Sequence, residues 1–277
     1  MKSSGDFHYP LEIVSDLTYN IIVRKHSEPH MKKTVYNIAA RFNQPLTVAH
    51  LSDIHGNFRC EILDAVKEAK PDIIAVTGDL ADGDSSASDE SIRFLEELAR
   101  TAPIFYSLGN HEIGLSESAR RRISAAGVHL LDDSFEKIGE VTVGGLTSGF
   151  FHAHIGNGRK NPRLFSTPPP DTFMLDFFER EDGFKILLCH HPEYFPEYIK
   201  ERKIDLVLSG HAHGGQIRLF GRGVLAPGQG LFPCYTSGVH EARLVISRGL
   251  ANTAKLIPRL FNETELVIIK LGFRSNN

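Results

Sequence analysis

The sequence lacks a cysteine framework, an excess of positive charge and any tryptophan. Its three cysteines, Cys60, Cys189 and Cys234, are odd in number and far apart, so neither a disulfide scaffold nor a zinc–thiolate site is expected. The 31 Lys and Arg residues are balanced by 34 Asp and Glu residues, a formal net charge of -3. This balance supplies no basic field for a nucleic-acid backbone, and general nucleic-acid binding is not expected.

Long apolar runs are also missing. One of the most apolar stretches, residues 266–269, is far too short to cross a bilayer, and acidic side chains interrupt the N-terminal segment where a signal peptide needs an unbroken apolar run. The sequence therefore predicts no transmembrane segment and a cytoplasmic protein, either free or peripheral to the membrane. What remains is an ordinary globular composition, with 41% hydrophobic residues, and an unusual number of histidines, 14 in 277 residues.

From residue 47 onward, short apolar runs alternate with helical patterns, which is typical of an α/β domain. Helices are expected at residues 61–70 and 91–100, because apolar side chains recur there at three-to-four spacing and a proline follows each segment. Strands rich in Ile, Val and Leu are expected at residues 47–51, 72–76, 103–107, 185–189 and 205–208.

The later part of the chain has a different character. Further strands are expected at residues 135–146, 216–220, 244–247 and 265–271, parted by glycines and loops, so a mixed or antiparallel second sheet is expected. The Gly- and Pro-rich residues 150–171 predict a long irregular loop. Residues 1–45 are interpreted as an N-terminal extension with an edge strand at 34–38, and residues 46–277 as one domain.

Polar clusters follow directly after the five strands of the α/β part. They are Ser52–His55, Gly78–Asp82, Gly109–Glu112, His190–His191 and Gly210–Gly215. Ligands of open α/β sheets gather at the carboxyl ends of the strands, so these clusters are expected to converge on one crevice.

The donors in these clusters are carboxylates, an amide and imidazoles. This set suits borderline divalent ions such as Mn, Fe, Zn or Ni better than Ca or a structural zinc. The seven candidate ligands are Asp53, His55, Asp79, Asn110, His190, His211 and His213. Seven donors exceed one tetrahedral site, and a carboxylate such as Asp79 can bridge two ions about 3.5–4 Å apart, so two divalent ions are expected.

The ordered motifs DxH, GDxxD, GNHE, a histidine after an apolar strand, and GHxH resemble those of the calcineurin-like metallophosphoesterase superfamily over about residues 47–213. The resemblance implies an α/β fold of two facing mixed β-sheets flanked by helices, a four-layer sandwich. It also implies a dimetal-dependent hydrolase of phosphoester or pyrophosphate bonds, in which a hydroxide bridging the ions is the nucleophile.

The same resemblance distributes the ligands. It assigns Asp53, His55 and His213 to one ion, Asn110, His190 and His211 to the second, and Asp79 to both. His111 then lies beside the scissile phosphate as the catalytic residue, where its imidazole stabilises charge or protonates the leaving oxygen. Asp82 is expected to steady that histidine, and His191 is interpreted as a structural residue.

Later residues extend the resemblance to a bacterial branch that includes UDP-diacylglucosamine pyrophosphatases. They are Gly210–Arg218, Ser247–Gly249 and Pro258–Arg259. Members of that branch often carry an N-terminal membrane anchor. None is expected here, which counts against a membrane-embedded substrate.

The substrate is expected to be a phosphorylated small molecule, a nucleotide or a lipid-linked phosphate. Candidate substrate-binding residues are Arg159, Lys160, Arg163 and Arg248. A cyclic-nucleotide or other small phosphodiesterase is the main alternative, because the metal ligands do not encode the leaving group. A protein Ser/Thr phosphatase is disfavoured, since no Arg follows Asp79, and a non-catalytic binding scaffold is disfavoured because no expected ligand is missing.

Overall fold

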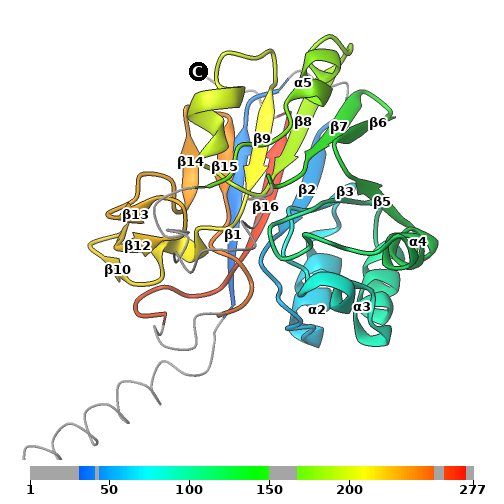
Figure 1. Cartoon of the computed structure of the whole chain (residues 1–277), viewed down its shortest axis with the longest axis horizontal. Coiled ribbons are helices and arrows are strands. Elements are labelled where there is room, and N and C mark those ends of the chain that lie inside the picture. The colour runs from blue at the N-terminus through cyan, green and yellow to red at the C-terminus, as the bar shows by residue number, and fades with distance from the viewer. Residues whose placement is uncertain (1–30, 41–43, 150–166, 253–258, 273–277) are drawn as a thin grey trace, which may run out of the picture. The chain divides into compact units, whose positions relative to one another are not determined.

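The structure is a computed structural model that describes residues 31–40, 44–149, 167–252 and 259–272. These residues belong to one unit, Met31–Asn277. It is a mixed α/β fold in which two mixed sheets, each of six strands, face each other and carry helices on their outer sides (Figure 1). The expected fold class is confirmed. Within the described residues, no helix combines the length and apolar character needed to cross a membrane.

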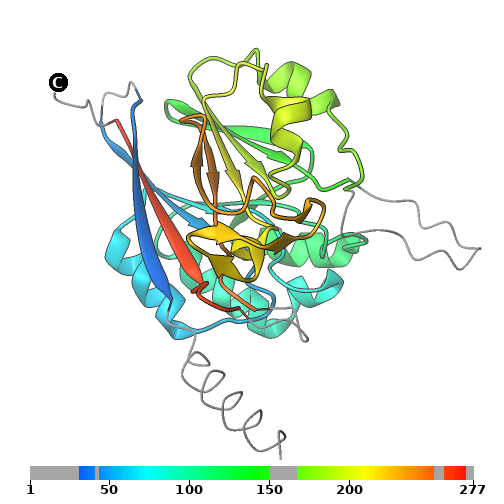
Figure 2. The same ribbon diagram turned by 90° about the vertical axis from the view of Figure 1, so that its left-hand side faces the viewer.

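The first sheet holds the strands that precede three of the polar clusters. Its order is β1 (Lys32–Ile38), β16 (Glu265–Leu271), β2 (Leu46–Leu51), β3 (Ile73–Val76), β4 (Ile104–Ser107) and β5 (Val128–Leu131). β16 runs antiparallel to β2, whereas the other neighbouring strands are parallel. Figure 2 shows β1 and β16, the blue and red strands, side by side. β3 and β4 are buried along their whole length, which explains their continuous apolar sequences.

Three helices cover the outer face of this sheet: α2 (Cys60–Ala69), α3 (Asp89–Ala99) and α4 (Glu117–Ala125). Ile62 and Leu95 enter the same core as Ile74 of the sheet. The sequence predicted α2 and α3 within two residues of their observed ends but did not predict α4. Only Ala119 and Ile123 of its nine residues are buried, so α4 has almost no apolar stripe to detect.

The second sheet has the order β14 (Gly238–His240), β15 (Leu244–Ile246), β9 (Leu206–Ser209), β8 (Phe184–Cys189), β7 (Val141–Leu146) and β6 (Ser134–Ile138). Its inner pairs are parallel and both outer pairs are antiparallel. The short helix α5 (Phe173–Phe178) and the π-helical turn η2 (Phe195–Ile199) pack into the core on its outer side.

Two strand predictions were wrong in detail, and a third strand, correctly predicted, belongs to a different sheet than expected. Residues 135–146 form two strands rather than one, because the chain turns at Gly139, which has φ +58°, and β6 pairs back on β7. Residues 216–220 contribute only β10 (Arg218–Leu219), which forms a small hairpin with β11 (Arg222–Gly223) outside the two large sheets. The strand at 265–271 exists, but it joins the first sheet as β16 rather than the second.

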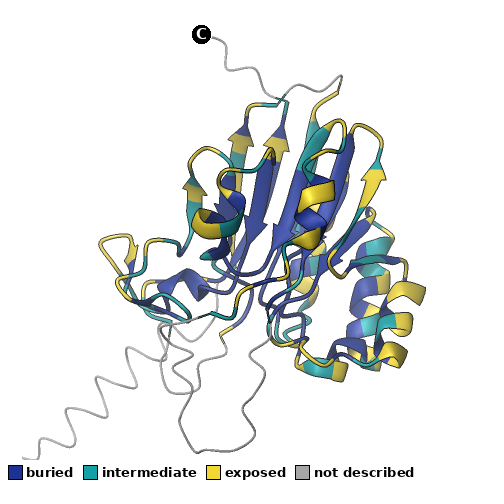
Figure 3. Ribbon diagram, turned by 45° about the horizontal axis from the view of Figure 1, so that its top comes forward, coloured by how far each residue is buried: buried dark blue, intermediate teal, exposed yellow. Residues whose placement is uncertain are grey.

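A shared apolar core lies between the two sheets. Val48 and Phe105 of the first sheet pack in one cluster with Val143, Ile186 and Leu208 of the second. Figure 3 shows the strands as the buried part of the fold, with exposed residues concentrated on the helices and loops. This packing brings the loops after β2, β3, β4, β8 and β9 to one place.

Candidate metal centre

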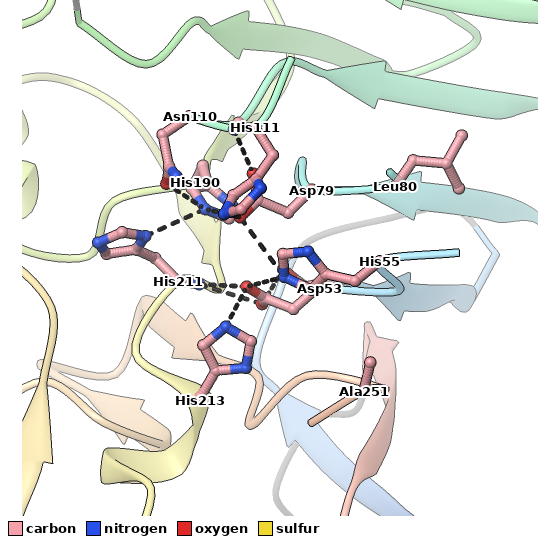
Figure 4. Close-up of polar contacts among 12 residues, drawn as sticks. Asp53, His55, Asp79, Leu80, Asn110, His111, His190, His211, His213 and Ala251 are labelled. Carbon is pink, nitrogen blue, oxygen red and sulfur yellow. Dashed lines mark hydrogen bonds and ion pairs between the residues drawn. The ribbon is translucent and has the colours of Figure 1, made fainter. Parts of the chain in front are cut away.

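Eight side chains from these five loops converge on one cluster, shown in Figure 4. The first sheet contributes Asp53, His55, Asp79, Asn110 and His111, and the second contributes His190, His211 and His213. His190 joins the two sets, because its Nε2 lies 3.2 Å from Asp79 Oδ2 and 3.1 Å from Asn110 Oδ1. The residues that follow these five strands thus lie together, as the sequence led us to expect.

Other contacts complete the cluster. His213 Nε2 lies 3.4 Å from Asp53 Oδ1, and His211 Nδ1 lies 3.2 Å from His190 Nε2. His55 Nε2 lies 3.6 Å from Asp79 Oδ2 and 3.9 Å from Asp53 Oδ1. The two carboxylates therefore stand between histidines that come from both sheets.

The cluster residues have an unusual backbone. Five of them have φ between 45° and 63°, in the left-handed region that side chains other than glycine rarely adopt: Asp53, His55, Asp79, His211 and His213. Backbone hydrogen bonds between loops hold part of this arrangement, from Asp53 N to Gly78 O at 3.2 Å and from His55 N to Asp79 O at 3.0 Å. Strain of this kind concentrates at functional sites, where the surrounding fold enforces it.

Two glycines allow the loops after β3 and β4 to touch. A Cβ on Gly109 would lie 2.2 Å from Asp79 Oδ1, and a Cβ on Gly78 would lie 2.6 Å from the Cα of Gly109. Gly78 also has φ +87°. Any larger residue at either position would push apart the loops that carry Asp79 and Asn110.

Glu112 organises these same loops, a role that the sequence analysis did not foresee. Its buried carboxylate accepts hydrogen bonds from the backbone N–H groups of Asp79, Leu80 and Gly109 at 2.9, 2.7 and 2.8 Å. It also accepts one from the Tyr106 hydroxyl at 2.7 Å. The signal in the sequence is the last letter of the GNHE motif, but a motif letter does not reveal which N–H groups a carboxylate will meet.

His111 lies at the open side of the cluster. Its side chain is 39% exposed, its backbone N–H donates to Asp79 Oδ1 at 3.0 Å, and its Nδ1 contacts the Asp82 carboxylate. The ring meets that of His55 edge-on, with centroids 4.7 Å apart. His111 is therefore accessible from solvent while Asp82 holds one of its nitrogens.

The two carboxylates dominate the electrostatics of the cluster. Burial alone would raise the pKa of Asp79, but the charge and hydrogen bond of His190 outweigh it and lower the pKa below its ordinary value. Burial opposes the charge of His190 in turn, yet Asp79 raises the pKa of His190 to about 10. The charges of Asp79 and His190 thus stabilise each other, and a divalent cation bound at the Nε2 of His190 would have to displace a proton there.

The remaining histidines of the second sheet behave differently. Burial lowers the pKa of His211 to about 3, with the neighbouring His190 acting in the same direction, and burial lowers the pKa of His213 to about 4. Both rings are neutral near pH 7 as a result. A neutral imidazole keeps the lone pair that a metal ligand needs.

The described residues contain groups of donor atoms that could hold metal ions, the atoms of each group lying within 4.8 Å of one another. One group is Asp53, His55 and His213, and another is Asp79, His190 and His211. The family resemblance assigns these same residues to its two ions, and Asn110 adjoins the second group through His190. Two further groups overlap them, His55–Asp79–His111 and His191–Glu193–His211, so the assignment of ligands to ions stays a prediction. His55 Nε2 is buried and has no hydrogen-bond partner among the described residues. The donor set and this orphaned nitrogen fit divalent cations.

The other predicted residues have varied positions. His191 is buried and its Nδ1 lies 2.9 Å from Ser148 Oγ, as a structural residue would. Arg248 is mostly buried and paired with Glu265, with Nε 3.3 Å from Oε2. Arg159, Lys160 and Arg163 lie outside the described residues, as does most of the loop expected at 150–171.

The chain belongs to the calcineurin-like phosphoesterase family, whose model matches residues 46–215. The uncharacterized protein YpbG of Bacillus subtilis is 27% identical over 254 residues, covering 87% of each chain. An uncharacterized metallophosphoesterase of Aquifex aeolicus is 29% identical, covering 82% of this chain and 83% of that one. Escherichia coli phosphodiesterase YaeI is 27% identical over 63% of each chain. The finer likeness to UDP-diacylglucosamine pyrophosphatases stays a prediction.

Proposed function

We propose that the protein is a dimetal-dependent hydrolase of phosphoester or pyrophosphate bonds. The observation that carries the proposal is the pair of donor groups, Asp53–His55–His213 and Asp79–His190–His211, which adjoin through the contacts of His55 with both carboxylates. When bound, two divalent cations would neutralise phosphoryl oxygens and lower the pKa of the water molecule that attacks phosphorus. Asp79 would contact both cations, and Asn110 would complete the second set.

His111 is the proposed catalytic residue. It is exposed beside the donor groups and lies in a group with His55 and Asp79, yet it is not needed to complete either ligand set. Contact of its Nδ1 with Asp82 leaves Nε2 directed to the cluster, 3.8 Å from Asp79 Oδ2. From this position the imidazole would stabilise charge on the phosphoryl group or give a proton to the leaving oxygen.

The substrate is proposed to be a phosphorylated small molecule, a nucleotide or a lipid-linked phosphate. A small phosphodiesterase activity is the second candidate, and the similarity to phosphodiesterase YaeI favours it. Arg248 is also proposed to bind the substrate through its guanidinium group. The nitrogens of this group already contact the Glu265 carboxylate. A cytoplasmic location and substrate binding by the side chains of Arg159, Lys160 and Arg163 are part of the same proposal.

The test combines metal analysis with a substrate panel. Metal-free protein is reloaded separately with Mn, Fe, Zn or Ni and assayed against phosphomonoesters, diesters, cyclic nucleotides and nucleotide-sugar pyrophosphates. We expect two metal equivalents per chain and turnover of at least one class. Loss of turnover in His111→Ala with both metals retained would support catalysis at this cluster. Tight metal binding without turnover of any class would instead favour the non-catalytic scaffold.

A further inference from the structure

His211 presents its two ring nitrogens to different surroundings. Nδ1 lies 3.2 Å from His190 Nε2, on the side of the Asp79 group. Nε2 lies 3.9 Å from Oε1 of Glu193, a residue that no part of the proposed function uses. A neutral imidazole has one protonated nitrogen and one lone pair, so the group beside Nε2 helps to decide which nitrogen is free for a metal.

For His190, a hydrogen bond to the backbone decides which ring nitrogen carries the proton. Its Nδ1 lies 2.7 Å from the carbonyl oxygen of Thr77. A carbonyl oxygen only accepts hydrogen bonds, so Nδ1 carries the proton and Nε2 faces Asp79. An acceptor on the far nitrogen thus orients His190 toward the cluster. His211 has a carboxylate near the corresponding nitrogen, but at 3.9 Å it is the negative charge of Glu193, not a hydrogen bond, that favours a proton on Nε2.

The carboxylate of Glu193 is held from two further segments of the chain. The Thr167 hydroxyl donates to Oε1, and the backbone of Gly228 packs so closely that a Cβ there would lie 2.3 Å from the same oxygen. Oε2 is buried and has no hydrogen-bond partner among the described residues. Burying an acid in this way is costly, which is not expected of an incidental surface carboxylate.

We propose that Glu193 is a positioning residue of the metal centre: it keeps the proton of His211 on Nε2, so that the Nδ1 lone pair faces Asp79 and His190. The inference rests on the proposed dimetal function, which it deepens. Carboxylates that accept from the distal nitrogen of a metal-bound histidine fix its tautomer and orientation and raise its basicity.

A third cation bound by His191, Glu193 and His211 is the competing explanation, since their donor atoms also lie within 4.8 Å of one another. Two observations disfavour it. Glu193 Oε1 already accepts from Thr167, and His191 Nδ1 is engaged with Ser148. Moreover, His211 would then have to bind one cation through Nδ1 beside His190 and another through Nε2 beside Glu193. A neutral imidazole has only one lone pair, so it cannot bind both without losing its remaining proton.

The test compares Glu193→Gln, which removes the charge but keeps an acceptor, with Glu193→Leu, which removes both. Glu197→Gln is the matched control, because Glu197 is an exposed acid four positions away on η2. Imidazole 15N shifts of the metal-free chain report the His211 tautomer, and titration with Mn²⁺ alone reports the affinity of each equivalent. Thermal unfolding of each metal-free variant reports any general loss of stability.

We expect the wild type and the Glu197→Gln control to show His211 protonated on Nε2. Glu193→Leu should lose that preference and bind one Mn²⁺ equivalent about 10- to 100-fold more weakly, with the other unchanged and Glu193→Gln in between. An unchanged tautomer and unchanged affinities would overturn the inference. Equal weakening of both equivalents together with a lowered melting temperature would also overturn it, because Glu193 would then be merely structural.

Two other results separate the remaining explanations. A third Mn²⁺ equivalent in the wild type that Glu193→Leu abolishes would make Glu193 a ligand and overturn the positioning role. If the wild type binds no Mn²⁺ while the tautomer still changes in Glu193→Leu, the control of the His211 proton stands and the proposed dimetal function fails.

Discussion

The two sheets contribute different chemistry to the same cluster. Among the eight residues of the cluster, both carboxylates and the amide, Asp53, Asp79 and Asn110, follow strands of the first sheet. The second sheet supplies imidazoles, from His190, His211 and His213. Within the eight-residue cluster, the negative charge therefore comes from the first sheet and the second sheet contributes imidazole rings, with the Glu193 carboxylate of the second sheet lying behind His211.

The two sheets also differ in how they are covered. The helices α2, α3 and α4 on the first sheet have 10, 11 and 9 residues, whereas α5 and η2 on the second have 6 and 5. Neither sheet holds a complete ligand set, so the apolar packing between them is what assembles the centre. Removing a donor of the first sheet should therefore have a different effect on metal binding from removing a donor of the second.

The largest effect is expected for Asp79→Asn. Asp79 contacts His55 of one donor group and His190 of the other, so its charge serves both. A neutral amide would leave less negative charge between the two cations, which repel each other. Both metal equivalents and nearly all turnover should therefore be lost. Metal analysis and turnover measure this, with Asp82→Asn as a control that keeps both metals. Wild-type metal content in Asp79→Asn would contradict the bridging role.

Removing a metal-ligand candidate of the second sheet should have a smaller effect on metal content and turnover. His213→Ala removes an imidazole that contacts Asp53 but leaves the Asp79, His190 and His211 group intact. One metal equivalent should be lost and the other retained, with turnover reduced but the chain still folded. Metal analysis together with thermal unfolding checks this. Loss of both metal equivalents in His213→Ala would contradict the expected difference between donors of the first and second sheets.

Much of the fold could be predicted from the sequence, because β3, β4, β8 and β9 carry continuous apolar runs followed by polar loops. The failures share a physical cause. α4 has too few buried residues to show a pattern, and the sheet that β16 joins depends on long-range pairing with β1 and β2. Local sequence carries no record of such pairing.

The donor residues of the centre were predictable for a related reason. They lie in short motifs at strand ends, so their types and spacing are visible locally. The supporting carboxylates were not. Glu112 meets the N–H groups of residues 32 and 33 positions earlier, and Glu193 meets Thr167 and His211 from separate loops. Only the folded chain brings these groups together.

His111 tests whether the first sheet supplies a reacting group in addition to ligands. His111→Ala should lower kcat by about two to four orders of magnitude while metal content stays normal, because the imidazole lies beside the donor groups and completes neither. Asp82→Asn should give a smaller loss, since it alters only the orientation of His111. Parallel loss of metal and activity in His111→Ala would identify it as a ligand instead.

Glu112→Gln tests the support of the first-sheet loops. The amide would turn a donor toward at least one of the backbone N–H groups of Asp79, Leu80 and Gly109. The free energy of unfolding should fall by about 3 kcal/mol, as for the breaking of other buried charged networks. Tyr106→Phe, which removes one donor, should cost about 1 kcal/mol. Equal small losses in both variants would show that the carboxylate is dispensable.

The smallest effect should come from the helices on the outside of the first sheet. The Oγ atoms of Ser88 and Ser116 accept from the backbone N–H groups of Ser91 and Ala119 at 3.2 Å, and so cap α3 and α4. Ser88→Ala or Ser116→Ala should each lower stability by about 1 kcal/mol, because one N–H in the first helical turn loses its acceptor. Thermal unfolding measures this, and metal content and kcat should stay at wild-type values. A change in metal content or kcat would mean that the outer helices influence the metal centre. The stability of α3 and α4 would then not be independent of the donor residues at the strand ends of the same sheet.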